Sequence, residues 1–164
     1  PGRLAERSAR APGSGSSGQP GEDDAGGAHA AAMPMTPIKT AIGIDAPASS
    51  VWPLIAEFRY WPAWGPSVRA VDSPTAVIAS GVRGRVQTTI GLWLPFRIER
   101  CEREVFWDWS VAGVHATGHS LRPISDERCE VEFSVSRLFL PYVWVLDRGL
   151  HRLRSLAEAR IQAD

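Results

Sequence analysis

Apolar and polar residues alternate along seven short segments of this chain, a pattern that predicts β-strands with one buried and one solvated face. The pattern is clearest in the last segment, where polar residues separate Cys129, Val131, Phe133 and Val135. We place the strands at residues 38–44, 68–71, 84–90, 94–101, 105–112, 115–121 and 129–135. Short turns containing Gly, Pro or Asp join the last six segments, so successive strands are expected to pair antiparallel in a meander.

The segment after the first strand has helical periodicity instead. Pro47 suits the first position of a helix, and one apolar face is formed by Val51, Leu54, Ile55 and Phe58. Pro53 removes a backbone donor and clashes with the preceding turn, so this helix is expected to be short or kinked. A compact turn rich in aromatic residues and proline follows at residues 60–66.

A longer helix is predicted at residues 141–161. Its apolar stripe consists of Leu146, Leu150, Leu153, Ala157 and Ile161. A helix of about 20 residues is about 30 Å long, and no other element is long enough to cover the apolar face of the sheet. We therefore predict an α+β helix-grip fold: a curved antiparallel sheet of about seven strands wrapped on the C-terminal helix, with one or two short helices after the first strand. The gap between sheet and helix is the natural place for an apolar pocket.

Residues 1–36 have a different composition from the rest of the chain. They contain seven of the fifteen glycines, and their only large apolar side chains are Leu4, Met33 and Met35. Such a segment cannot bury enough surface to offset its ordering entropy, so we predict a disordered tail or linker followed by one domain at residues 37–164. We favour a linker, a cloning remnant or an over-extended gene start over a functional arm.

Charge and cysteine content exclude several functions. The chain has 18 basic and 18 acidic residues, which argues against nucleic acid as a partner and against a polybasic membrane patch. After residue 36, no run approaches the roughly 18 apolar residues that a membrane-spanning helix needs. Cys101 and Cys129 are too few for a disulfide scaffold and are predicted to lie about 14 Å apart across the sheet. We expect a cytoplasmic protein with no integral membrane segment, and leave its oligomeric state open.

The order of several short motifs resembles the START-like, or birch-pollen-allergen-like, helix-grip superfamily. The similar branch is that of bacterial SRPBCC proteins, which includes polyketide cyclase/dehydrase and lipid-transport proteins. The resemblance covers residues 37–162 and rests on Ala46-Pro47 before Val51-Trp52, on residues 60–66, on Arg83-Gly84-Arg85-Val86, on Leu94-Pro95-Phe96, on Trp107 and Trp109 before Gly113, and on the final Leu-rich helix. It implies an internal cavity for hydrophobic ligands but leaves the activity open.

Seven tryptophans are many for so short a chain, and we expect several of them to line that cavity. Trp107 and Trp109 are two residues apart on one strand and therefore share a face. The alternative for each ring is an ordinary place in the core, and Trp61 is expected to be structural. The predicted cavity residues are Trp64, Val68, Thr88, Trp93, Phe96, Trp107, Trp109, His115, Phe133, Tyr142, Leu146 and Leu150.

His115 and His119 are the best candidates for polar chemistry. Four residues apart on a strand, they are expected to share a face at about 13 Å, too far apart to bind one metal ion. Either imidazole has the pKa range of a general acid or base, although a hydrogen-bonded histidine at the cavity or its rim is favoured. Asp108 alternates with the Trp pair and is expected to point outward.

Arg83 and Arg85 flank Gly84 near the start of a strand, and surface solvation is favoured for both. The alternative is that they bind a ligand carboxylate or phenolate, because the cyclases that this chain resembles hold an enolate with polar and Arg groups. The sequence has no phosphate-binding glycine loop, no nucleophile elbow and no zinc motif, so neither a cofactor nor a metal is predicted.

Three functions follow from this interpretation. The first is binding, with transfer as an extension, of a small hydrophobic or aromatic ligand between the sheet and the C-terminal helix. The second is a polyketide cyclase or dehydratase that acts in the same cavity, with His115, His119 and Arg85 as candidate catalytic residues. The third is a non-catalytic interaction or chaperone module. An enclosed pocket containing a histidine would favour catalysis, a dry pocket would favour binding or transfer, and a filled interior would favour the interaction module.

Overall fold

The computed structural model describes residues 36–163, apart from the side chains of residues 138 and 140. The prediction of a disordered tail at residues 1–36 therefore lies outside the described residues, except for its last residue. The elements are, in chain order, Ile38–Ile44 (β1), Ala48–Ala56 (α1), the 3-10 turn Phe58–Tyr60 (η1), Trp61–Trp64 (α2), Val68–Asp72 (β2), Arg83–Thr88 (β3), Trp93–Glu102 (β4), Phe106–Val111 (β5), Val114–Ser125 (β6), Arg128–Val135 (β7), the 3-10 segment Arg137–Tyr142 (η2) and Val143–Ile161 (α3).

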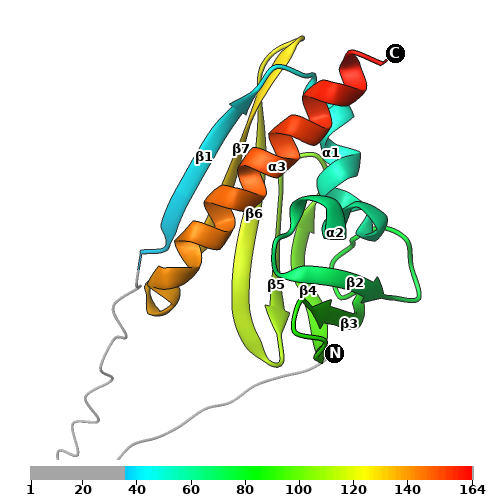
Figure 1. Ribbon diagram of the computed structural model, residues 1–164, viewed down its shortest axis with the longest axis vertical. Coiled ribbons are helices and arrows are strands. Elements are labelled where there is room, and N and C mark those ends of the chain that lie inside the picture. Colours follow the sequence, from blue (N-terminus) through cyan, green and yellow to red (C-terminus); the bar gives the residue numbers. More distant parts are fainter. Residues whose placement is uncertain (1–35, 164) are drawn as a thin grey trace, which may run out of the picture. The chain divides into compact units, whose positions relative to one another are not determined.

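The seven strands of residues 36–163 form one antiparallel sheet, in the order β1-β7-β6-β5-β4-β3-β2. Strands β2 to β7 are a meander, and β1 returns to pair with β7, with Ile38 opposite Val135. Helix α3 crosses one face of this sheet, and α1 and α2 lie on the same face (Figure 1). The predicted α+β helix-grip fold is confirmed.

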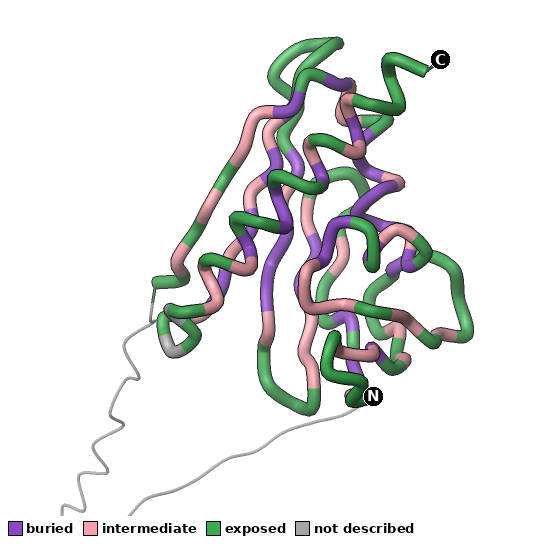
Figure 2. Tube along the Cα trace, viewed as in Figure 1, coloured by how far each residue is buried: buried purple, intermediate pink, exposed green. Residues whose placement is uncertain are grey.

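The core lies between this face of the sheet and the three helices, where the buried segments of the strands meet the buried side of α3 (Figure 2). Leu146, Leu150, Leu153 and Ala157 are buried, as their helical spacing predicts. Ile161, the last member of the stripe, is exposed because it lies at the end of the helix. Gly149 also faces inward, and a Cβ there would lie 3.4 Å from Pro66 and 3.6 Å from the Phe133 ring. Gly149 therefore lies where α3 contacts α2, and a Cβ there would make only ordinary van der Waals contacts.

Helix α1 has nine residues, with Pro53 inside it and Pro47 one position before its first residue. The helix ends at Ala56, where the backbone N–H of Glu57 donates to the carbonyl of Pro53 at 3.0 Å. The compact turn predicted at residues 60–66 winds through the end of η1 and the whole of α2. These two turns bring Trp61 and Trp64 under the sheet.

Two register shifts interrupt the middle of the sheet. One separates Ile98 from Arg100 where β4 pairs with β5, and the other separates Asp108 from Ser110 where β5 pairs with β6. Both lie beside Trp109. Each β-bulge breaks the alternation of side chains between the two faces of a strand, so inward and outward positions cannot be counted through this region from the sequence alone.

Candidate functional site

The aromatic residues pack mainly against one another in the centre of the molecule. Trp61 stacks on Trp107 with centroids 5.0 Å apart and a 12° interplanar angle. Its ring also meets Phe58 edge-on at 4.8 Å and Trp109 at 5.1 Å. The Trp61 indole N–H donates to the backbone carbonyl of Ile55 at 3.0 Å, so its one polar atom has a buried partner. Trp61 is structural, and it anchors the α2 turn to α1.

The interior beneath α3 is therefore nearly filled. Trp64, Trp107, Phe133 and Leu146 border a space of only about 40 Å³, far below the roughly 300–1,000 Å³ of small-molecule sites. Phe96 and Leu150, also predicted as cavity residues, are buried in the core and border neither this space nor the open pocket at the end of the sheet. Half of the twelve predicted cavity residues are packed core, because the α2 turn inserts two tryptophans where a cavity was expected.

An open pocket of about 440 Å³ lies next to this core, at the end of the sheet. It lies between strands β2 to β7 and the η2 segment, and not beneath the middle of α3. Its described lining residues are Ser67, Val68, Val86, Thr88, Leu94, Trp109, Val111, Val114, His115, Ala116, Thr117, Val135, Phe139 and Tyr142. Five of them are among the predicted cavity residues: Val68, Thr88, Trp109, His115 and Tyr142.

The other pocket residues were missed, although strand alternation could have identified some of them. Val86 lies on the same face as Thr88, and Val135 on the same face as Phe133. Leu94 similarly shares the inward face of its strand with Phe96. Ser67 and Phe139 come from irregular segments, for which no periodic pattern exists.

The few polar atoms of the pocket largely satisfy one another. The hydroxyls of Ser67 and Tyr142 lie 2.6 Å apart and join the α2–β2 connection to the last residue of η2. The indole N–H of Trp109 donates to the hydroxyl of Thr117 at 2.8 Å. The Trp109 ring therefore has a fixed orientation and presents an apolar surface to the pocket.

The two candidate histidines have different environments. His119 pairs with Trp107 across β5 and β6, whereas His115 pairs with Ser110 beyond the register shift. Residues opposite one another in a sheet share a face, and Trp107 and Ser110 lie on opposite faces. The expectation that the two histidines share a face is therefore wrong: the bulge leaves His115 exposed at the rim of the pocket and His119 buried in the core.

His119 is enclosed by aromatic rings. It stacks on Trp107 at a centroid distance of 3.9 Å and meets Phe133 edge-on at 4.5 Å. Its Nε2 lies 3.3 Å from the Thr117 hydroxyl, while its Nδ1 makes no hydrogen bond of normal geometry. Burial lowers the pKa of His119 from 6.5 to about 3, although the nearby Trp107 backbone opposes this shift. The imidazole is therefore neutral at physiological pH, and a base that is so hard to protonate is unsuited to proton transfer there.

Trp93 and Arg85, both predicted near the ligand, lie on the outer face of the sheet. Trp93 is 43 % exposed, since it is one residue out of step with the inward positions Leu94 and Phe96 of β4. The Arg85 guanidinium lies 5.6 Å from the centre of the Trp93 ring and pairs with Asp72 at 2.5 Å. Neither side chain borders the pocket, so Arg85 is in no position to hold a ligand carboxylate.

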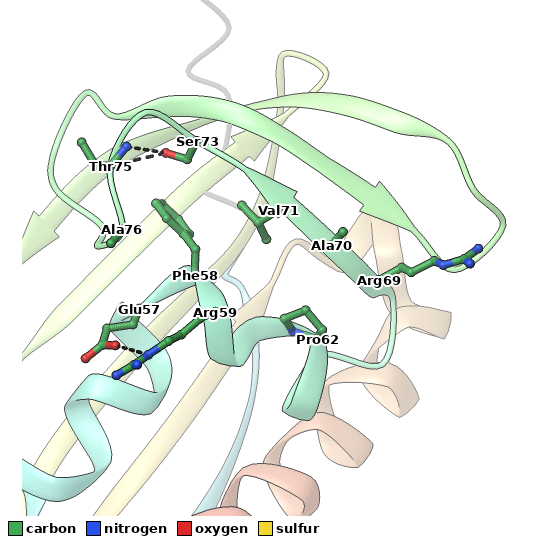
Figure 3. Close-up of a pocket in the computed structure, with 10 residues that line it drawn as sticks. All are labelled: Glu57, Phe58, Arg59, Pro62, Arg69, Ala70, Val71, Ser73, Thr75 and Ala76. Carbon is green, nitrogen blue, oxygen red and sulfur yellow. Dashed lines mark hydrogen bonds and ion pairs between the residues drawn. The ribbon is translucent and has the colours of Figure 1, made fainter.

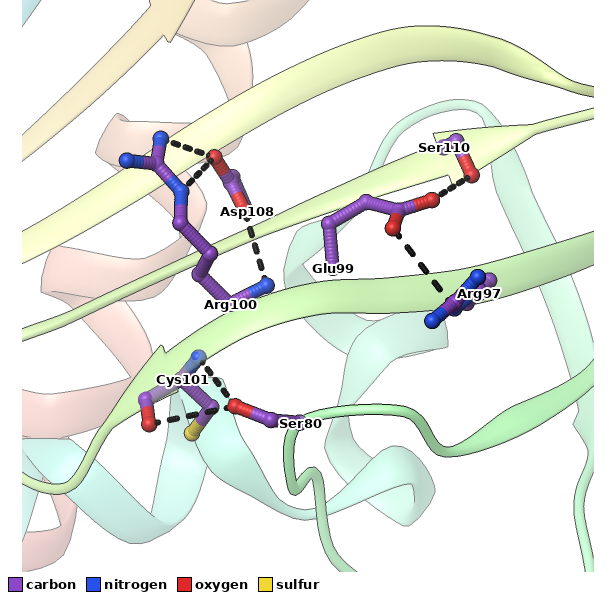
Figure 4. Close-up of polar contacts among 7 residues, drawn as sticks. All are labelled: Ser80, Arg97, Glu99, Arg100, Cys101, Asp108 and Ser110. Carbon is purple, nitrogen blue, oxygen red and sulfur yellow. Dashed lines mark hydrogen bonds and ion pairs between the residues drawn. The ribbon is translucent and has the colours of Figure 1, made fainter.

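Asp108 faces away from the core, as alternation requires, but it is only 2 % exposed. Its carboxylate accepts the backbone N–H of Arg100 at 3.0 Å and is paired with the Arg100 guanidinium (Figure 4). Beside it, the Ser110 hydroxyl donates to Glu99 at 2.6 Å. These contacts fasten the β4 bulge to β5 directly behind Trp109, so Asp108 supports the pocket wall from the far side of the sheet.

Replacing Asp108 by alanine is expected to lower the free energy of unfolding by about 2 kcal/mol, because it leaves the Arg100 backbone N–H without its acceptor. Arg100→Ala should cost less, since Arg100 is largely exposed and its own backbone bond survives that change. Urea denaturation of both variants measures the difference. Equal losses would mean that the ion pair, and not the backbone bond, stabilises the bulge.

A second hollow lies on the other side of α2, between η1 and β2 (Figure 3). The loop after β2 crosses it, held by the Phe58 N–H, which donates to the Ala76 carbonyl at 3.0 Å. Arg59 pairs with Glu57 at 2.6 Å at its edge, and Arg69 points away from the other lining residues. The charges here are either paired or directed outward, so this groove offers no convergent set of groups for a ligand.

Metal ligation and thiol chemistry find no support among residues 36–163. No group of three or more His, Cys, Asp or Glu side chains is placed to hold a metal ion in this part of the chain. Cys101 on β4 and Cys129 on β7 are free, with β5 and β6 between them. Burial raises the pKa of the Cys129 thiol to about 11, so this thiol is protonated at neutral pH.

Comparison with known proteins places this architecture among helix-grip structures. The aromatase/cyclase Zhui from a Streptomyces species has a TM-score of 0.60 at 12% identity, and the match covers 77% of this chain and 95% of that one. An uncharacterised protein from Bacillus thuringiensis has a TM-score of 0.59 at 16% identity, covering 74% of this chain and 98% of that one. The di-domain ARO/CYC BexL has a TM-score of 0.59 at 19% identity, covering 74% of this chain but only 46% of its own. No family model and no curated protein matches the chain. These structures share the fold of this chain, and this agrees with the fold that the sequence resemblance predicted.

Proposed function

We propose that this protein binds a small, largely apolar and uncharged molecule in the open pocket at the end of the sheet. The observation that supports this most strongly is the chemistry of the lining. Its described residues are mostly aliphatic and aromatic, and none of them is Asp, Glu, Lys or Arg. A volume of about 440 Å³ lies within the range of small-molecule sites.

The polar atoms of the pocket suggest how such a ligand is oriented. The Ser67 and Tyr142 hydroxyls form a pair on one side, and the indole of Trp109 lies among the apolar residues. We expect an aromatic or aliphatic body to pack against Trp109, with one hydroxyl or carbonyl directed at Tyr142. A charged ligand would lose its hydration here without gaining a partner.

Dye binding tests this proposal. Nile red, which is neutral and fluoresces in apolar surroundings, should bind the wild-type protein, and Trp109→Ala should weaken this binding about tenfold by removing the largest apolar wall. Trp93→Ala is the matched control, because that ring lies on the outer face of the sheet, and it should leave the dye affinity unchanged. Native mass spectrometry of the purified protein should in addition detect a bound apolar molecule. If no ligand is carried and no dye binds, the protein is not a carrier of this kind.

Catalysis of a polyketide cyclisation or dehydration is the second candidate, favoured by the similarity to the structures of Zhui and BexL. The arrangement of titratable groups favours binding instead. Among the described pocket residues, only His115 has an imidazole, carboxylate or basic side chain, and it is exposed at the rim. A synthetic poly-β-ketone thioester should therefore cyclise no faster with the protein than with His115→Gln. A rate enhancement that His115→Gln abolishes would establish the enzyme.

A further inference from the structure

Trp144, in the first turn of α3, is the most exposed large hydrophobic side chain among the described residues. It is 87 % exposed, although tryptophan is highly buried on average in folded proteins. Its ring forms no stacking contact, cation–π contact or hydrogen bond with the described part of the chain. Single exposed apolar residues are common on protein surfaces, so the significance of Trp144 depends on the residues around it.

A hollow of about 500 Å³ lies directly beside this ring. It is bordered by α3 and by β1, the strand at one edge of the sheet. Figure 1 shows the first turns of α3 next to β1. The hollow shares no lining residue with the open pocket at the end of the sheet. Its described lining residues are Thr40, Val143, Trp144, Asp147, Arg148 and His151.

Four of these residues form one exposed stripe of α3, which we call the α3 patch: Trp144, Asp147, Arg148 and His151. The last three follow Trp144 by three, four and seven residues, and this spacing places all four on one face of a helix. That face is opposite the stripe from Leu146 to Ala157, which is buried against the sheet. Helix α3 therefore presents an aromatic ring, an acid and two basic groups together to the solvent.

The charges of the α3 patch are arranged so that the patch complements a copy of itself. A two-fold axis perpendicular to α3 presents the same patch with the direction of the helix reversed. Trp144 and His151 are equally far from the middle of the patch, and so are Asp147 and Arg148. The reversal therefore sets Asp147 opposite Arg148 of the second copy, and Trp144 opposite its His151. A parallel arrangement would instead bring the two Asp147 carboxylates together.

The charged groups of the patch are available for this contact. Arg148 forms no ion pair or hydrogen bond with the described residues. Asp147 lies 3.7 Å from the Nε2 atom of His151 and has no arginine or lysine partner in the described part of the chain. An ion pair between Asp147 and Arg148 of a second copy therefore breaks no stronger pair within the chain.

From this arrangement we propose that the α3 patch is the interface of a two-fold symmetric homodimer. Helix α3 packs antiparallel on α3 of the second copy, and each Trp144 enters the hollow beside the other. A hollow of about 500 Å³ has room for an indole ring, because sites for whole small molecules begin at roughly 300 Å³. Tryptophan and arginine are also the side chains that contribute most often to the energy of protein interfaces.

Charge reversal tests this dimer by analytical ultracentrifugation. The wild type should contain dimers at about 100 µM, and Asp147→Arg or Arg148→Asp alone should weaken the association at least about tenfold. Each variant then places like charges opposite one another twice. An equal mixture of the two variants should form dimers again, because one chain presents two neighbouring arginines and the other two neighbouring carboxylates. The matched control is Asp126→Arg, in the exposed β6–β7 turn, which should associate like the wild type.

Trp144→Ala should weaken the dimer as well. At protein concentrations where the wild type is monomeric, the same substitution should leave the stability almost unchanged, because the ring contributes nothing to the core of its own chain. A loss of association in this variant therefore reports on the interface and not on unfolding.

Three outcomes would overturn the proposal. A wild type that is monomeric at about 100 µM has no such interface. A wild-type dimer that both charge reversals leave intact uses another surface. A mixture of the two folded variants that stays monomeric excludes the antiparallel pairing of Asp147 with Arg148. None of these results bears on the ligand pocket, and every variant of the α3 patch should keep the dye affinity of the wild type.

Discussion

Replacing Trp61 by alanine is expected to lower the free energy of unfolding by about 3 to 5 kcal/mol, the range measured when large aromatic side chains are removed from cores. The ring is 1 % exposed and contacts Phe58, Trp107 and Trp109. Removing it leaves a cavity that these rigid rings cannot refill, and it also leaves the Ile55 carbonyl without its indole donor. Urea denaturation followed by far-ultraviolet circular dichroism measures the loss without relying on tryptophan fluorescence.

Two further variants serve as controls for Trp61→Ala. Trp61→Phe keeps most of the ring contacts and should cost less than Trp61→Ala, with the lost hydrogen bond contributing about 1 kcal/mol. Trp144→Ala removes the same kind of side chain from the surface, where it is 87 % exposed, and should change the stability by no more than about 0.5 kcal/mol. A small loss for Trp61→Ala would mean that the aromatic cluster can rearrange, and that the interior is more open than the structure describes.

Acid is expected to destabilise the protein through His119. Its pKa is about 3 in the folded protein, against the ordinary value of 6.5 for an imidazole in the unfolded chain, so the unfolded chain binds the extra proton between these two values. The stability that a neutral His119 provides is fully present above pH 6.5 and is lost as the pH falls toward 3. Between pH 7.5 and pH 4.5 this one group should remove about 2 to 3 kcal/mol of unfolding free energy.

His119→Phe isolates this effect. Phenylalanine keeps a ring stacked on Trp107 and does not titrate, whereas every carboxylate of the protein titrates as before. Denaturant unfolding at pH 7.5 and 4.5 should therefore show a smaller loss in this variant, by about the same 2 to 3 kcal/mol. His151→Gln, an exposed histidine on α3, should behave like the wild type. Equal losses in wild type and His119→Phe would show that water reaches the ring and that its pKa is close to the ordinary value.

The fold was predictable from the sequence because its evidence is periodic. Alternation placed all seven strands, and the stripe from Leu146 to Ala157 placed the helix that covers them. The position of the pocket was not predictable in the same way. The turn at residues 60–66 has no period, and its winding into η1 and α2 carries Trp61 and Trp64 into the space that a simple sheet and helix would leave open.

The candidate site was harder to predict because a shift of one residue along a strand moves a side chain from one face of the sheet to the other. A bulge beside Trp109 puts His115 and His119 on different faces, and a sequence read with a strict period of two cannot contain that shift. Trp93 was predicted in the cavity together with Phe96, but the two residues are three apart on β4 and therefore lie on opposite faces of the sheet.

The pairing of β1 with β7 sets the order in which this protein can fold. The first strand is synthesised early, yet its partner ends at Val135, almost at the beginning of η2. During translation β2 to β6 can assemble while Ile38–Ile44 is still unpaired. The apolar side of that strand becomes buried only after both β7 and α3 have been synthesised. Such long-range contacts make folding slow and expose an unpaired edge for longer. Chains that stop before β7 should therefore aggregate, and the unpaired first strand is the segment through which they would associate.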